Sequence, residues 1–209
     1  MDQEIKKQEA EQQPDVQKSA LRELWEFVFD LVKVFVIAAV IIFPVRYYVA
    51  QPFIVSGSSM EPNFYTGQYL IINELAYHLH DPQRGDIIVF KYPKDTSQYF
   101  IKRVIGLPGE KVKIENNHVI IYNQQNPNGF TLDETYLPST TQTLPVGNGI
   151  TTLGSDEYFV LGDNRIASSD SRFWGPVPRN DIVGKVLIRA FPFQDFKKFD
   201  SVNYQAAQP

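Results

Sequence analysis

Three short segments of the sequence carry residue types that could act together in nucleophilic catalysis. The first, residues 55–64, is the serine-rich run VSGSSMEPNF, which follows a short apolar stretch. The second, residues 98–110, has the sequence QYFIKRVIGLPGE, and the third, residues 160–177, has the sequence VLGDNRIASSDSRFWGPV. A serine hydroxyl is a poor nucleophile at its own pKa and needs an adjacent base. If the first segment supplies a nucleophile, another segment must therefore supply the base.

Lys102, in the second segment, is the candidate base. In an extended strand Phe100, Lys102 and Val104 point to the same face, so the lysine lies between two apolar neighbours. Burial disfavours the charged amine and lowers the pKa of a lysine toward neutrality. Histidine is the usual base, but the three histidines of the chain lie outside the three segments. A desolvated lysine is the other known way to activate a serine.

Each segment also has a plainer interpretation when it is taken alone. Runs of serine and glycine are common in loops that have no catalytic role. A lysine in an apolar strand can guard an exposed sheet edge against aggregation. The charged third segment is typical of a solvated surface loop, or of an ion-paired support beneath a site. Only the combination of the three segments favours catalysis over these alternatives.

The elements that must position these segments are predominantly strands. Residues 50–209 alternate β-branched and aromatic runs with Gly, Pro, Asn and Asp, which is typical of a β domain. Asn116 and Asn117 separate two such runs and predict a two-residue hairpin turn. Residues 123–156 are rich in Asn, Thr, Pro and Gly and predict a long loop or a small excursion from the domain. The other predicted strands are residues 52–55, 86–93, 98–107, 156–164 and 182–191.

The N-terminal quarter has a different character. Residues 1–20 are almost free of apolar side chains, which predicts a disordered tail. Residues 21–49 begin as an amphipathic pattern and continue as an uncharged apolar run from Val34 to Val45, which predicts a transmembrane anchor helix. The alternatives are a helix lying flat on a membrane and a buried core helix. Basic residues are concentrated before the apolar run, so the N-terminus is expected in the cytoplasm and the β domain outside.

Composition excludes several classes of function. Cysteine is absent, which excludes disulfides, thiolate metal sites and a cysteine nucleophile. A net charge of -4 argues against a nucleic-acid-binding protein. We expect neither a metal nor an organic cofactor, since no cluster of suitable ligands is visible in the sequence.

Four motifs in order resemble those of type I signal peptidases, membrane-anchored serine endopeptidases that remove signal peptides from exported proteins. The SGSSMEP run resembles the nucleophile block of the family, and residues 83–90, QRGDIIVF, resemble its RGD-type strand. Residues 101–109, IKRVIGLPG, resemble its lysine block, and residues 162–172, GDNRIASSDSR, resemble its Gly-Asp-Asn block. The resemblance extends from the apolar run to about Phe191.

The resemblance implies a mostly β fold in which two antiparallel sheets form a substrate groove, as in signal peptidases and self-cleaving repressors, with one N-terminal transmembrane helix. It implies that Ser59 is the nucleophile, Lys102 the general base, and Ser168 the hydroxyl that orients the lysine amine. The structural ion pairs it implies near the site involve Arg103, Asp163, Asp170 and Arg172. Gly57 stands where some members have a serine or threonine that donates to the oxyanion, so the Ser59 N–H is the assured donor.

The implied substrate is the signal peptide of an exported preprotein, bound as an added strand between residues 53–55 and 99–101. Further implied partners are the lipid bilayer of the plasma membrane and, by proximity, the export machinery. The alternatives are a catalytically inactive, membrane-tethered β domain that binds extended peptides, and a self-cleaving, repressor-like protein. The side chains expected to line the substrate pockets are Phe53, Val55, Met60, Phe100 and Ile101.

Overall fold

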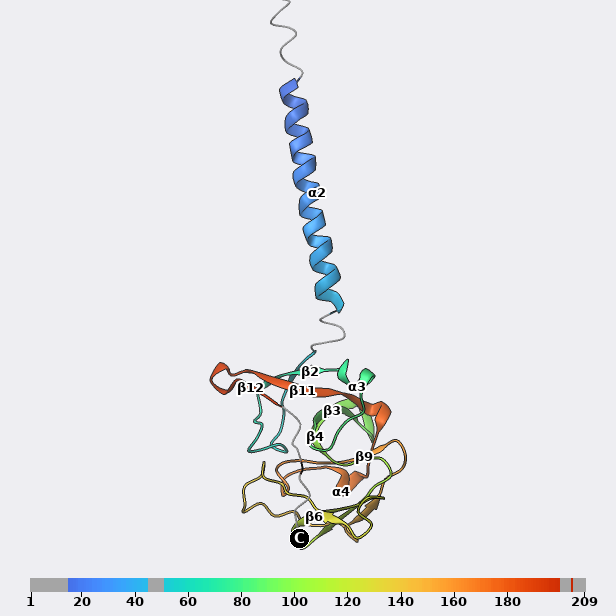
Figure 1. The fold of residues 1–209 in the computed structure, drawn as a ribbon. Coiled ribbons are helices and arrows are strands. Elements are labelled where there is room, and N and C mark those ends of the chain that lie inside the picture. Colours follow the sequence, from blue (N-terminus) through green and yellow to red (C-terminus); the bar gives the residue numbers. More distant parts are fainter. Residues whose placement is uncertain (1–14, 45–50, 200–203, 205–209) are drawn as a thin grey trace, which may run out of the picture. The chain divides into compact units, whose positions relative to one another are not determined.

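The structure is a computed structural model that describes residues 15–44, 51–199 and 204 (Figure 1). The chain forms two compact units, residues 1–47 and 48–209. The first contains helix α2 (Asp15–Pro44), drawn in blue in Figure 1. This helix begins within the segment predicted as a disordered tail, whose first 14 residues lie outside the described part. Residues 45–49 of the predicted anchor also lie outside it.

The apolar side chains of α2 are exposed. Trp25 and Phe43 are each 73% exposed, and the large apolar residues between them are exposed as well. Arg22 and Glu26 form an ion pair one turn apart on the polar face, with a separation of 3.0 Å. The sequence predicted that this region crosses a membrane. Within the described residues, no helix is both long enough and apolar enough to span a bilayer.

The larger of the two sheets carries Lys102 on one of its interior strands. Its strand order is β1-β2-β11-β3-β4-β9-β10, with β12 paired to β11, and its paired strands run antiparallel. The registers place Lys102 of β4 opposite Ile88 of β3. The strands are β1 (Gln51–Ile54), β2 (Tyr69–Asn73), β3 (Ile87–Tyr92), β4 (Asp95–Gly106), β9 (Glu157–Leu161), β10 (Val177–Pro178), β11 (Ile182–Phe191) and β12 (Lys197–Lys198).

The smaller sheet is built around the hairpin that the two asparagines predict. Asn116 and Asn117 have φ angles of 52° and 66°, the left-handed conformation that such a turn requires. The segment predicted as a loop or excursion contributes two short strands to this sheet. Its strand order is β7-β6-β5-β8, formed by β5 (Lys111–Glu115), β6 (His118–Tyr122), β7 (Phe130–Thr131) and β8 (Ile150–Thr152). Mostly β architecture with two antiparallel sheets, as the sequence predicted, is therefore confirmed.

Short helical turns and three apolar clusters complete the second unit. The turns are α3 (Ala76–Leu79), α4 (Ser171–Trp174), η2 (Arg179–Asp181) and η3 (Phe193–Asp195). One cluster lies around Phe90 and Trp174, and a second joins Ile105 and Phe159 to the smaller sheet. The third holds Met60 against β1, β2, β3 and β11. Strands β3 and β4 therefore have packed side chains around them, so the backbone that carries Lys102 is held in place.

Candidate active site

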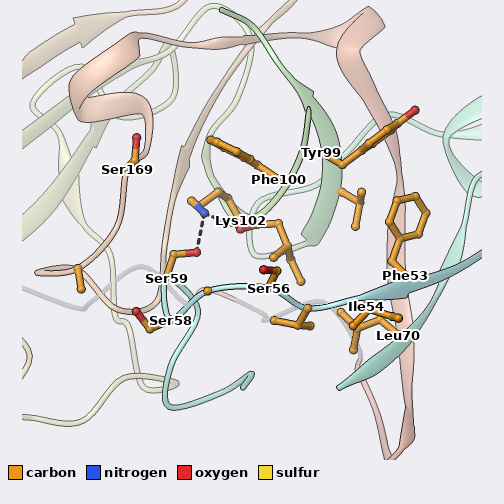
Figure 2. Close-up of a pocket in the computed structure, with 15 residues that line it drawn as sticks. Phe53, Ile54, Ser56, Ser58, Ser59, Leu70, Tyr99, Phe100, Lys102 and Ser169 are labelled. Carbon is orange, nitrogen blue, oxygen red and sulfur yellow. Dashed lines mark hydrogen bonds between the residues drawn. The ribbon is translucent and has the colours of Figure 1, made fainter. Parts of the chain in front are cut away.

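Ser59 and Lys102 meet at a cavity of the second unit. Lys102 Nζ lies 2.7 Å from Ser59 Oγ, and the two groups are hydrogen-bonded (Figure 2). The same amine donates to the carbonyl oxygen of Ile101 at 2.8 Å. These contacts bring together residues 43 positions apart in the chain. The distance is within the range in which a base can take a proton from a hydroxyl.

The surroundings of Lys102 favour the neutral amine. The residue is only 3% exposed, and the Phe100 ring centroid lies 5.4 Å from Nζ. Burial lowers the pKa of Lys102 from 10.5 to about 8, although the nearby carboxylates of Asp170 and Asp163 act in the opposite direction. Desolvation outweighs this attraction because both carboxylates are already paired with arginines.

Two buried ion pairs lie near the amine, one joining β4 to the loop after β9 and the other joining that loop to α4. Arg103 Nε and a terminal nitrogen donate to the two oxygens of Asp163 at 2.9 and 2.7 Å, and Asn63 adds a third bond to that carboxylate. Asp170 accepts from Arg172 Nε at 2.8 Å and from the backbone N–H of Gly162 at 3.1 Å. The four residues predicted as structural ion pairs therefore form two pairs, Arg103–Asp163 and Asp170–Arg172.

The loop that carries Ser59 is tied on both sides. The Gly57 N–H donates to the Thr66 hydroxyl oxygen at 3.0 Å, and that hydroxyl donates back to the Gly57 carbonyl at 3.1 Å. On the other side, Asn164 bonds to the carbonyl oxygens of Ser58 and Ser59. Gly57 has φ +94°, a conformation that side chains other than glycine rarely adopt. The backbone conformation at this position therefore favours glycine over a serine or threonine that could donate to the oxyanion.

Ser168 lies near the dyad but does not make the predicted bond. Its side chain is 5% exposed, and among the described residues Ser168 Oγ has no hydrogen-bond partner. The serine packs against Gly162, where an added Cβ would lie 2.2 Å from Ser168 Oγ and 2.4 Å from the Ser59 carbonyl oxygen. This crowding shows that Ser168 and the nucleophile loop are in close contact through Gly162.

A cavity of about 340 Å³ opens beside the dyad. Strands β1 and β4 are not neighbours in the sheet, yet both line it, so the sheet curls around this space. The Phe53 and Tyr99 rings both line it on the side away from the Ser59–Lys102 bond, with centroids 5.6 Å apart (Figure 2). Four of the five predicted pocket residues line the cavity: Phe53, Val55, Phe100 and Ile101.

Met60 is the exception among the predicted pocket residues. It is 1% exposed and packs in the apolar cluster with Phe64 and Leu70, rather than facing the cavity. The residue follows Ser59 directly, and its side chain points into the core, where it anchors the loop. Among the described residues, no group of three or more His, Asp or Glu side chains is placed to hold a metal ion.

The sequence prediction missed several residues that contact the site. Asn164 was noted only as part of a motif, and Thr66 and Arg165 were given no role. Their contacts join segments that are far apart in the chain, for example 106 positions between Asn164 and Ser58. The remaining cavity-lining residues that were not predicted are Ile54, Ser56, Ser58, Leu70, Val89, Tyr99, Ala167 and Ser169.

Comparison with known proteins identifies the family to which the chain belongs. Residues 28–191 match the family model described as signal peptidase, peptidase S26. The chain belongs to this family. A probable signal peptidase I-1 of Synechocystis sp. is 34% identical over 201 residues, covering 92% of this chain and 97% of its relative. A signal peptidase I of Leptolyngbya laminosa is 37% identical, covering 77% of this chain and 78% of the relative.

A solved member of the family also aligns with the chain. The crystal structure of a signal peptidase I from Enterococcus faecalis V583 has 33% sequence identity and a TM-score of 0.41, and the alignment covers 51% of this chain and 97% of that one. Membership of the family makes this chain a peptidase of the signal peptidase I type. The type I signal peptidase resemblance of the sequence motifs is thereby confirmed.

Proposed function

We propose that the protein is a serine endopeptidase that removes N-terminal signal peptides from exported preproteins, with Ser59 as nucleophile and Lys102 as general base. The observation that carries this proposal is the 2.7 Å separation of Lys102 Nζ and Ser59 Oγ beside an open cavity. A pKa of about 8 leaves a useful fraction of the lysine neutral near pH 7–8. Membership of the signal peptidase family supports the choice of substrate.

The proposed reaction is acyl transfer to water in two steps. Neutral Lys102 takes the hydroxyl proton of Ser59 as Oγ attacks the scissile carbonyl, whose oxygen becomes an anion near the Ser59 N–H. The lysine then gives its proton to the leaving amine, which releases the mature protein and leaves the signal peptide as an ester on Ser59. In the second step Lys102 takes a proton from water as the water oxygen attacks that ester, and it returns the proton to Ser59 Oγ as the signal peptide leaves with a free carboxyl end.

The proposed substrate binds as an extended strand between β1 and β4. Within residues 51–199, β1 pairs only with β2, and β9 pairs with β4 only from Arg103 onward. The edges at residues 51–54 and 99–102 are therefore available for backbone hydrogen bonds with a peptide. Alternate peptide side chains would point into the cavity, where Phe53 and Tyr99 narrow the space and favour small residues.

The test is cleavage of a preprotein by the purified full-length chain, followed by mass spectrometry of the new N-terminus. Ser59→Ala and Lys102→Ala should each abolish cleavage, because nucleophile and base act as a unit. The matched controls are Ser56→Ala and Ser58→Ala, which alter neighbouring serines of the same cavity and should retain activity. Cleavage by Ser59→Ala at the wild-type rate would contradict the assignment.

The second candidate is an inactive, membrane-tethered domain that binds extended peptides. It predicts that the wild-type chain binds a signal peptide without cutting it. The buried lysine–serine contact argues for the enzyme, since burying an amine with no chemical role costs stability.

We place the enzyme at the plasma membrane, with helix α2 holding it to the bilayer, its N-terminus in the cytoplasm and the second unit outside. The exposed apolar side chains of α2 support this proposal, because an apolar face this large needs a covering partner. The concentration of Lys and Arg before the apolar run supports the orientation. Signal peptides emerge at that membrane, so the enzyme would work close to the export machinery.

A further inference from the structure

Asn164 makes two contacts to the loop that carries Ser59. Its side-chain Nδ2 donates to the carbonyl oxygen of Ser58 at 3.1 Å, and its backbone N–H donates to the carbonyl oxygen of Ser59 at 3.0 Å. The Asn164 side chain is itself fixed, because its Oδ1 accepts the Ala167 N–H at 3.2 Å. Asn164 does not line the cavity, so its side chain does not reach the space where a substrate would lie.

Because of the geometry of the peptide bond, these contacts also determine where the Ser59 N–H points. The carbonyl of Ser58 and the N–H of Ser59 belong to one peptide unit, which is not among the two cis peptides of the described residues. In a trans peptide the C=O and the N–H point in opposite directions. A donor that fixes the Ser58 carbonyl toward Asn164 therefore fixes the Ser59 N–H away from Asn164.

The Ser58 carbonyl also accepts the Glu61 N–H of the same turn at 3.1 Å, so Asn164 is the residue that ties this peptide unit to a distant segment of the chain. Gly57 precedes it at φ +94° and has no Cβ to limit rotation, so the turn before the nucleophile is intrinsically adaptable. Thr66 fixes the peptide units on either side of Gly57, but not the unit between Ser58 and Ser59. Among the hydrogen bonds of residues 51–199, none uses the Ser59 N–H, which leaves this donor for a ligand.

We propose that Asn164 is a positioning residue for catalysis, which orients the Ser59 N–H toward the oxyanion by holding the Ser58 carbonyl on the opposite side. The inference rests on the proposed function, since it assigns a role to the Ser59 N–H in that reaction. Gly57 supplies no side-chain donor, so the loss of this single N–H leaves the developing negative charge poorly stabilised. Rotation of the peptide would in addition turn a carbonyl oxygen toward that charge.

Two substitutions of Asn164 test the role of its Nδ2 donor. Asn164→Asp keeps an oxygen to accept the Ala167 N–H but removes the Nδ2 donor, while Asn164→Ala removes both without adding charge. Both keep the backbone bond to Ser59. We expect each to lower kcat by about 10–100-fold, below the ~10²–10³ that follows complete loss of an oxyanion donor. The control is Ile166→Ala, which trims a side chain that is 77% exposed in the same loop.

A pair of matched inhibitors tests the oxyanion directly. A peptidyl trifluoromethyl ketone adds Ser59 Oγ to its carbonyl carbon, giving a tetrahedral alkoxide while the hydroxyl proton passes to Lys102. The corresponding peptidyl alcohol binds the same groove but forms no such adduct. In the full-length chain, both Asn164 variants should lose about 10–100-fold in affinity for the ketone, in proportion to kcat, and keep their affinity for the alcohol.

The outcomes distinguish this role from others. Equal losses of affinity for ketone and alcohol would indicate a general effect on the groove and would overturn the proposal, as would an unchanged kcat in Asn164→Ala. Recovery of kcat at high pH in Asn164→Ala would show that the residue acts through Lys102 instead. A wild-type chain that neither cleaves preprotein nor prefers the ketone would overturn the proposed function, and this inference with it.

Discussion

At the scale of single residues, the site depends on how the pKa of one amine is lowered although two carboxylates lie near it. Asp163 and Asp170 would hold Lys102 in its charged form if they were free. Each is instead engaged by an arginine, so its negative charge is largely balanced locally. Burial then decides the protonation state of the lysine. The two ion pairs thus hold the surrounding backbone in place, while burial still lowers the pKa of Lys102.

The first prediction concerns the pH dependence of activity. The pKa of Lys102 is lowered to about 8, and only the neutral amine can accept the Ser59 proton. We expect kcat/KM to rise with pH through a midpoint near 8 and to level off above it. The measurement is kcat/KM from pH 6 to 10 with a peptide that has no titrating groups near the scissile bond. A midpoint near 10.5, or a flat profile, would show that the lysine is not a buried base.

The same pKa predicts a pH-dependent effect on stability. Below about pH 8 Lys102 is protonated in both states, and the folded state bears the cost of the buried charge. Between about 8 and 10.5 the unfolded state binds more protons, so the free energy of unfolding rises with pH and the cost disappears. Lys102→Met should therefore stabilise the protein by about 3 kcal/mol at pH 6 and by much less above pH 10.5. Denaturant unfolding at the two pH values measures this, and a pH-independent difference would contradict it.

At the scale of elements, local patterns could be predicted and long-range contacts could not. The two asparagines between β5 and β6 marked the hairpin, and the alternation of residues in β4 placed Lys102 on an apolar face. Strand β2 was missed although its sequence, YLIIN, is apolar and bounded by polar residues. The core position of Met60 was missed because a loop residue has no periodicity from which its direction can be inferred.

The contacts of the Gly162–Ser168 loop also lay beyond the sequence. Its motif suggested ion pairs, and these pairs form, but the partners of Asn164 and Arg165 come from segments brought together only by the fold. Hydrogen bonds of this kind depend on distances of a few tenths of an ångström, which residue types and spacing do not encode. Residue types and spacing therefore singled out Ser59 and Lys102, which the fold brings within hydrogen-bond distance, but not most of the residues that position them.

Gly162 lies where this loop contacts the Ser59 loop, and an added side chain there tests that contact. An added Cβ would lie 2.4 Å from the Ser59 carbonyl oxygen, so the loops must separate in Gly162→Ala. We expect kcat to fall by about 10²-fold, because shifts of about 1 Å at a nucleophile have effects of that size. The control is Gly154→Ala, whose Cβ meets only the end of the Glu157 side chain at 3.3 Å. Steady-state kinetics on both variants checks this, and similar activities would show that the loops can adjust.

A second contact at this scale joins the excursion to the site. Glu134 accepts from Arg165, whose side chain is fully buried, and Arg165 also donates to the Gly162 carbonyl. Glu134→Ala leaves a buried guanidinium without its counter-charge and should lower the free energy of unfolding by about 3–5 kcal/mol. The matched control is Glu115→Ala in the exposed pair with Lys113, which should lose less than about 1 kcal/mol. Urea unfolding compares the two, and equal losses would mean that the buried pair is not a support.

At the scale of the whole molecule, the helix proposed to attach the protein to a membrane and the proposed catalytic residues belong to different units. The exposed apolar side chains of α2 belong to one unit, whereas the cavity and the dyad belong to the other. A change confined to α2 should therefore alter where the protein resides without altering the reaction it performs on a soluble peptide. A change in the dyad should do the reverse.

Vesicle flotation of the full-length chain tests this separation. We expect the wild type to float with phosphatidylcholine vesicles, and Ile37→Asp to lose about 100-fold in partitioning, because an aspartate in the apolar core of a bilayer costs about 2.5–3.5 kcal/mol. Glu26→Gln, in the charged half of the same helix, should float like the wild type. All three proteins should cleave a short soluble peptide at the same rate, since the dyad is untouched. A wild type that stays below the vesicles, or an Ile37→Asp variant that floats equally well, would show that α2 does not attach the enzyme to lipid.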